Sequence, residues 1–192
     1  MLILHRAQAP VARWRQTRFL RVPLSLILAS GLTGQGCSQD GGESRAAKTT
    51  RRDTVSASVS ATVASLEAAE GEAERSRQLV HIAAAAVGNY EPLEGEHRGS
   101  LTQGRAQDHM LLLRYGRCYR ILAVGGSGLN DLDLALYDRD QVERLRDLSS
   151  DRYPMLGVAP SLCPNRTDAY RLEVRAQQGA GSYTVGVWQS PL

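Results

Sequence analysis

The chain has 192 residues, with 23 basic and 20 acidic side chains and a formal net charge of +3. Five of the arginines precede residue 37 and no acidic residue does, which leaves 18 basic against 20 acidic side chains in the remainder. This balance gives no argument for the basic surface on which nucleic-acid binding depends, so nucleic acid is not an expected partner. The remaining length allows one compact domain and a tether.

Residues 1–36 have the pattern of a signal peptide. An arginine-rich start is followed by a short apolar run over residues 22–32. As a helix this run would be roughly 16 Å long, about half of the ~30 Å needed to cross a bilayer. A basic start, a short apolar stretch and small residues after it are typical of an export signal.

The segment Leu32-Thr33-Gly34-Gln35-Gly36-Cys37-Ser38 resembles the lipobox of bacterial lipoproteins. Two positions differ from that pattern, because Gly34 and Gln35 stand where the family has Leu and a small residue. The resemblance implies that Cys37 is acylated, becomes the new N-terminus and anchors the protein in a membrane. Ser38, which is not Asp, implies an outer-membrane lipoprotein of the cell envelope.

Ordinary cleavage after residue 36 is the alternative, and it would give a periplasmic or secreted protein. Residues 34–36 also satisfy a small-x-small rule for cleavage. That outcome would leave Cys37 as an unpaired thiol in an oxidising compartment, so we favour lipidation.

Residues 37–58 are polar and rich in Gly, Ser and Thr, which predicts a flexible tether. Residues 59–88 predict one helical spacer that ends near Gly88. Its small residues form one stripe, which either packs loosely on the domain or serves as a seam between copies. The stripe comprises Leu66, Ala69, Ala73, Ser76, Val80, Ala83 and Val87.

Residues 96–190 change to short segments with β-type alternation, separated by turn residues. No segment of helical length intervenes, so parallel βαβ units are disfavoured. The pattern predicts a mainly β fold, an antiparallel, jelly-roll-like β-sandwich. The predicted strands cover residues 98–101, 109–114, 118–124, 132–137, 142–148, 170–176 and 182–188.

Cys118 and Cys163 lie at the edges of two such segments and predict a disulfide within the sandwich. The bond would close a long loop and stabilise the fold by roughly 4 kcal/mol. A zinc site is disfavoured, because the two cysteines have neither CxxC spacing nor a nearby pair of histidines.

The same segments resemble the bacterial pre-peptidase C-terminal domain, a jelly-roll sandwich appended to secreted enzymes. The most distinctive stretch is Asp131-Leu132-Asp133-Leu134-Ala135-Leu136-Tyr137-Asp138, followed by Asp168–Val174 and Gly181–Val187. Cys118 and Cys163 do not belong to the general pattern of that family. The resemblance implies a fold and no particular activity.

The glycine-rich stretch that begins at Gly125 raises the question of a cation site. Asn130, Asp131 and Asp133 offer three oxygen ligands of the kind calcium prefers, with Asp138 and Asp140 expected across the next turn. The simpler interpretation, which we favour, is a hairpin with acidic residues facing solvent. No cofactor is otherwise indicated.

The sequence contains no catalytic motif that we recognise, and His109 beside Asp108 would point to the opposite face of a strand. We therefore expect a protein without enzyme activity, namely a lipid-anchored envelope protein with a binding or structural module. A calcium- or glycan-binding module, or an accessory or inhibitor of a secreted hydrolase, is the alternative. Tyr170, Tyr183 and Trp188 are expected to fill the core and not to form a sugar platform.

Overall fold

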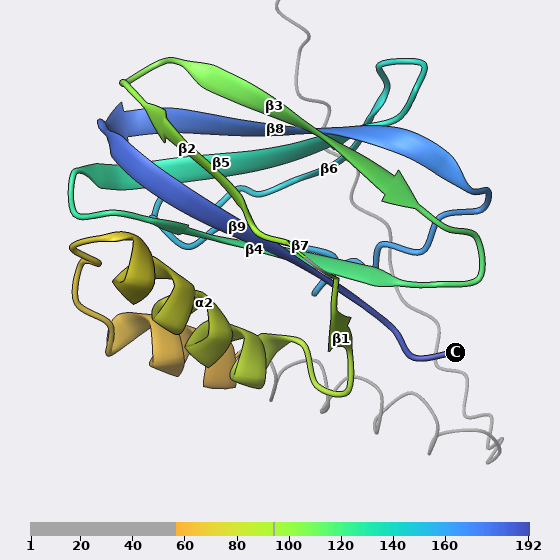
Figure 1. Cartoon of the computed structure of the whole chain (residues 1–192), viewed down its shortest axis with the longest axis horizontal. Helices are drawn as coiled ribbons and strands as arrows, with labels where there is room; N and C mark the ends of the chain where they lie inside the picture. The colour runs from red at the N-terminus through yellow and green to blue at the C-terminus, as the bar shows by residue number, and fades with distance from the viewer. Residues whose placement is uncertain (1–56, 94) are drawn as a thin grey trace, which may run out of the picture. The chain divides into compact units, whose positions relative to one another are not determined.

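The structure is a computed structural model that describes residues 57–93 and 95–192. Cys37, the predicted export signal and most of the predicted tether lie outside these residues. Within the described ranges, nine strands form two antiparallel sheets, and a helix lies against the outer face of one of them (Figure 1). No helix among the described residues has the length and apolarity needed to span a bilayer.

The first sheet is centred on two long strands, β4 (Tyr119–Gly125) and β9 (Gly181–Gln189). Three short strands complete it. Both β1 (Glu91–Pro92) and β2 (His97–Leu101) pair with β9, and β7 (Met155–Leu156) pairs with β4.

The second sheet has the order β3-β8-β5-β6. Its strands are β3 (Ala106–Leu113), β8 (Asp168–Gly179), β5 (Leu129–Tyr137) and β6 (Glu143–Arg146). The mainly β, antiparallel sandwich predicted from the sequence is therefore confirmed. All seven predicted strands are present, while β1 and β7, with two residues each, are too short to show alternation.

The main core lies between the two sheets, and alternation along the strands builds it. On β8, Tyr170, Leu172 and Val174 point inward, while the intervening residues are charged and only partly buried. On β9, Tyr183 and Val185 contribute from the opposite sheet.

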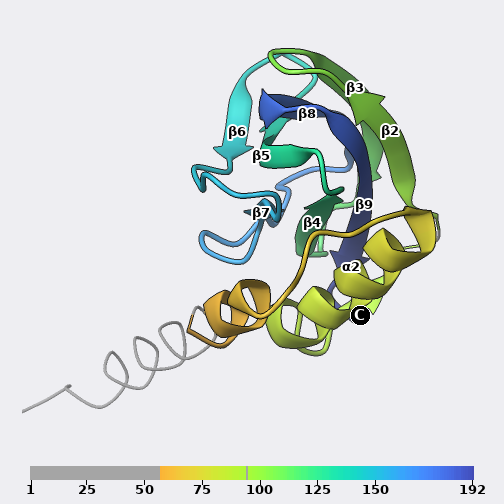
Figure 2. The ribbon, with the colours of Figure 1, turned by 90° about the vertical axis from the view of Figure 1, so that its left-hand side faces the viewer.

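A second core lies on the outer face of the first sheet, under helix α2 (Glu72–Ala86). The two views show this helix as a third layer beside β4 and β9 (Figures 1 and 2). Leu79 and Ile82 pack there against Leu122, Val124 and Trp188 of the sheet. Strands β4 and β9 are consequently buried on both faces, which in β4 corresponds to the continuous apolar run of residues 121–124.

The single helix predicted over residues 59–88 is wrong in one respect, because the structure interrupts it. Residues 57–64 are helical, residues 66–70 are not, and α2 starts only after Gly71. Ala69 forms a parallel β-bridge with Gly126, and its carbonyl accepts a hydrogen bond of 3.1 Å from the Ser127 N–H. Gly71, with φ of 150°, allows the turn into α2.

The break also changes which face of the helix is buried. Val80 and Ala73, both on the predicted stripe, are exposed. The buried face of α2 instead contains Leu79, Ile82 and Ala86. Residues before Gly71 do not share one helical phase with those after it, so the predicted stripe does not exist as one surface. The helix ends as expected, with Gly88 at φ of 61°.

Contacts beneath α2 are tested by a substitution at Gly186. A Cβ there would come within 2.6 Å of the Trp188 ring and 3.0 Å of Leu79. We expect Gly186→Ala to lower the free energy of unfolding by about 1 to 3 kcal/mol, because the indole or the helix must shift. Chemical denaturation measures this change.

Gly181→Ala is the matched control on the same strand, because its Cβ would meet only ordinary contacts at 3.5 Å. Equal free energies of unfolding for the two variants would contradict the expectation, because they would show that the packing of Trp188 tolerates a side chain at Gly186.

Candidate functional site

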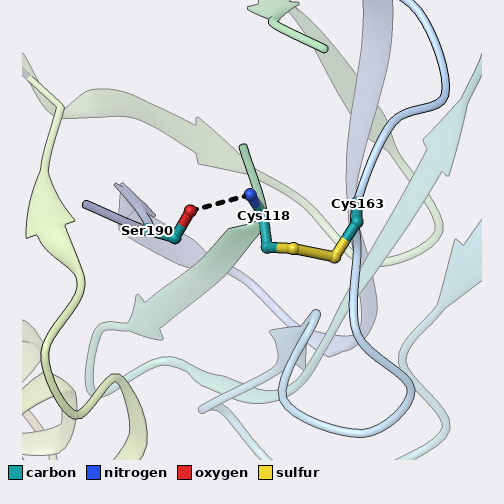
Figure 3. Close-up of a disulfide and its surroundings, with 3 residues drawn as sticks. All are labelled: Cys118, Cys163 and Ser190. Carbon is teal, nitrogen blue, oxygen red and sulfur yellow. Dashed lines mark hydrogen bonds between the residues drawn. A yellow bond between two sulfur atoms is a disulfide. The ribbon is translucent and has the colours of Figure 1, made fainter. Parts of the chain in front are cut away.

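The predicted disulfide between Cys118 and Cys163 is present (Figure 3). It joins the start of β4 to the loop that precedes β8. Next to it, the Cys118 N–H donates to Ser190 Oγ at 3.1 Å, and the Tyr119 N–H donates to the Leu162 carbonyl at 2.7 Å. The bond thus fastens a long loop to the central sheet at the point where the C-terminal segment also attaches.

The three residues of the predicted calcium site lie on strand β5 and not in the loop before it. Asn130 Oδ1 accepts a hydrogen bond of 3.4 Å from Arg152, and Asp133 Oδ2 accepts one of 2.6 Å from Gln177. Burial, together with the neighbouring carboxylates of Asp133, Asp151 and Asp147, raises the pKa of Asp131.

The expected gathering of these residues with Asp138 and Asp140 is wrong. Asp131 and Asp138 stand at opposite ends of β5, roughly 23 Å apart at the rise of an extended strand. Asp138 caps the next hairpin instead, accepting backbone hydrogen bonds of 2.9 Å from Asp140 and Val142. These bonds and that from Arg144 lower the pKa of Asp138.

Within the described part of the chain, no group of three or more His, Cys, Asp or Glu side chains is arranged to hold a metal ion. Calcium binding by Asn130, Asp131 and Asp133 stays a prediction from the sequence.

An apolar groove lies between α2 and the segment that leads from β1 to β2, and its volume is about 540 Å³. Val80, Ala83 and Ala84 line it from the helix, Pro92 from the opposite side, and Trp188 from β9. Val80 and Ala84 are exposed although both are apolar. The groove therefore offers an open apolar site of the size at which small ligands or single side chains bind.

Two further features define the ends of this groove. The absence of a side chain at Gly186 leaves room for the Trp188 ring, which a Cβ there would meet at 2.6 Å. Glu96 stands at the rim, where its Oε2 accepts a hydrogen bond of 2.8 Å from the Ser76 hydroxyl and pairs with Arg98 at 2.8 Å. The carboxylate is thus already neutralised by a protein partner, and the groove itself remains apolar.

A polar cluster fills the inner side of the sandwich edge between β2 and β3. The rings of His97 and His109 lie 4.9 Å apart, and His109 Nε2 forms a hydrogen bond of 2.7 Å with the Tyr183 hydroxyl. Burial lowers the pKa of both histidines and raises the pKa of Tyr183 to about 12. The cluster thus gives the hydroxyl of the buried Tyr183 a hydrogen-bond partner at this edge of the sandwich.

The side chains of Asp108 and His109 point to opposite faces of β3, as the alternation of the strand predicts. The Asp108 carboxylate pairs with Arg171 at 2.9 Å on the outer face of the sheet, while His109 points inward to Tyr183. The two residues therefore do not form part of a catalytic triad.

The aromatic side chains behave as expected. Tyr170 and Tyr183 belong to the core between the sheets, and Trp188 belongs to the core under α2. Tyr115, in contrast, is exposed. These positions do not form the exposed row of rings by which many sandwiches bind sugars.

Neither the groove nor the histidine pair was predicted from the sequence. Each is assembled from elements far apart in the chain, so no local spacing indicates it. The one available signal was the run of apolar residues around Val80, of which Val80 and Ala83 were predicted to belong to a stripe, while Ala84 was assigned no role.

The chain matches no protein-family model and no curated protein. Among solved structures it is similar to the pre-peptidase C-terminal domain of collagenase from Bacillus anthracis. The TM-score is 0.41 and the sequence identity 16%, over 50% of this chain and 89% of that chain. The fold class stated above rests on the pairing of the strands themselves.

The histidine cluster generates a prediction about pH. Because the folded state lowers the pKa of His97 and His109 below the unfolded value of about 6.5, the unfolded state binds more protons below that pH. The two neutral histidines therefore contribute their full stabilisation above about pH 6.5. That contribution is lost as the pH falls towards their lower pKa values in the folded state.

We expect the free energy of unfolding to fall more steeply between pH 7 and 5 in the native chain than in a His97→Gln/His109→Gln variant. Denaturation curves at each pH measure the difference, which cancels contributions from the carboxylates. Parallel pH profiles for the two proteins would contradict the expectation.

Proposed function

We propose that this chain is an exported, lipid-anchored protein of the bacterial cell envelope, and that its β-sandwich is a non-catalytic binding module. The disulfide between Cys118 and Cys163 is the observation that supports export, because such bonds persist in oxidising compartments. With those two cysteines paired, Cys37 is the remaining one, directly after a segment with the pattern of an export signal. An acyl group on Cys37 gives this third cysteine a role.

The membrane, reached through that lipid, is the first partner in this proposal, and Ser38 favours the outer membrane. The second partner is another envelope protein, whose apolar side chain occupies the groove beside α2. The apolar lining supports a protein segment over a glycan, because the Trp188 ring is already covered by protein. Nucleic acid is not a partner in this proposal.

The anchor is tested at Cys37. In cells that carry out lipoprotein maturation, we expect the mature chain to begin with an acylated Cys37 and to partition into detergent. Cys37→Ala should stay in the aqueous phase, while its Cys118–Cys163 bond forms as before. Mass spectrometry of the N-terminal peptide measures the acyl mass, with Ser38→Ala as a control that retains the cysteine. An unmodified Cys37 would remove the anchor from the proposal.

The groove is tested with an environment-sensitive dye such as anilinonaphthalene sulfonate. We expect the purified native chain to enhance its fluorescence, and Ala84→Glu to reduce that enhancement severalfold by placing a charge in the groove. His81→Glu is the matched control, because His81 is exposed on the same helix and does not line the groove. Equal dye binding by all three proteins would exclude the groove as an apolar site.

A further inference from the structure

Strand β3 is an open edge of the second sheet. It pairs with β8 on one side, and among the described strands none pairs with its other side. An edge strand presents alternate backbone N–H and C=O groups to solvent, and these groups are a template on which another extended chain can pair. Natural edges are commonly protected by lysine, proline or a bulge, whereas β3 has an unbroken register with β8 over all eight residues.

The outer face of this edge is apolar at its centre. Met110 and Leu112 are 64% and 59% exposed, and they lie side by side at alternate positions of the strand. Apolar side chains of this size on an edge strand are a known hazard for aggregation unless a partner covers them.

Charged residues of opposite sign flank the apolar pair. Asp108 precedes it, with its carboxylate on the outer face, where one oxygen pairs with Arg171 at 2.9 Å, and Arg114 follows it one residue after the strand ends. Arg114 is exposed, and within the described residues its guanidinium has no ion-pair partner. Read along one face of the strand, the order is acidic, apolar, apolar, basic.

This order is complementary to itself when two copies run antiparallel. With Leu111 on the two-fold axis, Asp108 of each copy lies opposite Arg114 of the other, and Met110 lies opposite Leu112. A parallel arrangement would place like charges opposite each other, and a shift of two residues would leave both charges opposite apolar or turn residues. Charge complementarity thus selects one orientation and one register.

We propose that β3 pairs with β3 of a second copy of this chain, so that two four-stranded sheets join into one continuous sheet. The contact is isologous, as two-fold homodimers require. It covers the apolar pair, satisfies the free backbone groups of the edge and gives Arg114 a carboxylate partner. One strand from each copy makes a small interface, so the dimer is in reversible equilibrium with the monomer.

The proposal does not depend on the lipid anchor or on the groove. Strand β3 belongs to the second sheet, whereas α2 packs on the first. The anchor would, however, raise the local concentration of copies on a membrane and favour the pairing. The two single charge reversals, Asp108→Arg and Arg114→Asp, test the proposed register directly. In each, both cross-strand pairs bring like charges together.

We expect sedimentation equilibrium of the full chain, purified from the cells that express it in a density-matched detergent, to give a monomer–dimer equilibrium. Each single reversal should weaken the dimer by roughly tenfold or more, because two favourable pairs become two repulsive ones. An equimolar mixture of the two variants should form a heterodimer, since every Arg then faces an Asp. Glu91→Arg, an exposed reversal on β1, should leave the equilibrium unchanged.

Recovery in the mixture separates pairing from misfolding, because two unfolded chains would not rescue each other. Met110→Lys provides a second test, and we expect it to abolish the dimer while the thermal unfolding of the monomer stays cooperative. A native chain that remains monomeric at all concentrations would overturn the proposal. Single reversals that dimerise as well as the native chain, or a mixture without heterodimer, would overturn it too.

Discussion

Burial of strand β9 on both of its faces is the constraint on which the structure depends. Its inward side chains, Tyr183 and Val185, pack in the core between the sheets. Its outward side chains, Thr184 and Trp188, are also buried because α2 covers them. A strand with two buried faces needs a layer on each side, so the helix is a third layer of the domain and not a spacer attached to it.

The groove follows from how α2 meets that strand. Trp188 fills the space that Gly186 leaves on β9, and α2 rests against the indole through Leu79. Towards its C-terminal half, α2 also exposes Val80 and Ala84 opposite the segment that returns to the sheet. Apolar side chains therefore line both a packed core and an open groove within one helix. The same residues that stabilise the third layer give the domain its candidate binding site.

The two sheets differ in how their edges are finished. In the first sheet, β1 and β2 both pair with the same side of β9. At the opposite edge of that sheet, the short β7 pairs with β4. In the second sheet, β3 is long and regular and carries Met110 and Leu112 outward. An edge of this kind with charges of opposite sign at its ends favours its own copy over other strands, because only a matching order pairs all four residues.

Local sequence determined the strands, since alternation such as that of residues 170–176 on β8 depends only on neighbours two residues apart. It also identified the pair Cys118 and Cys163, because just three cysteines are present and one follows the predicted leader. Tertiary structure alone decided where the predicted helix breaks, because Ala69 forms its β-bridge with Gly126, a residue distant in the sequence. It likewise decided that His97 meets His109 and that β3 is an edge, since both depend on which strands become neighbours, and residues distant in sequence determine that.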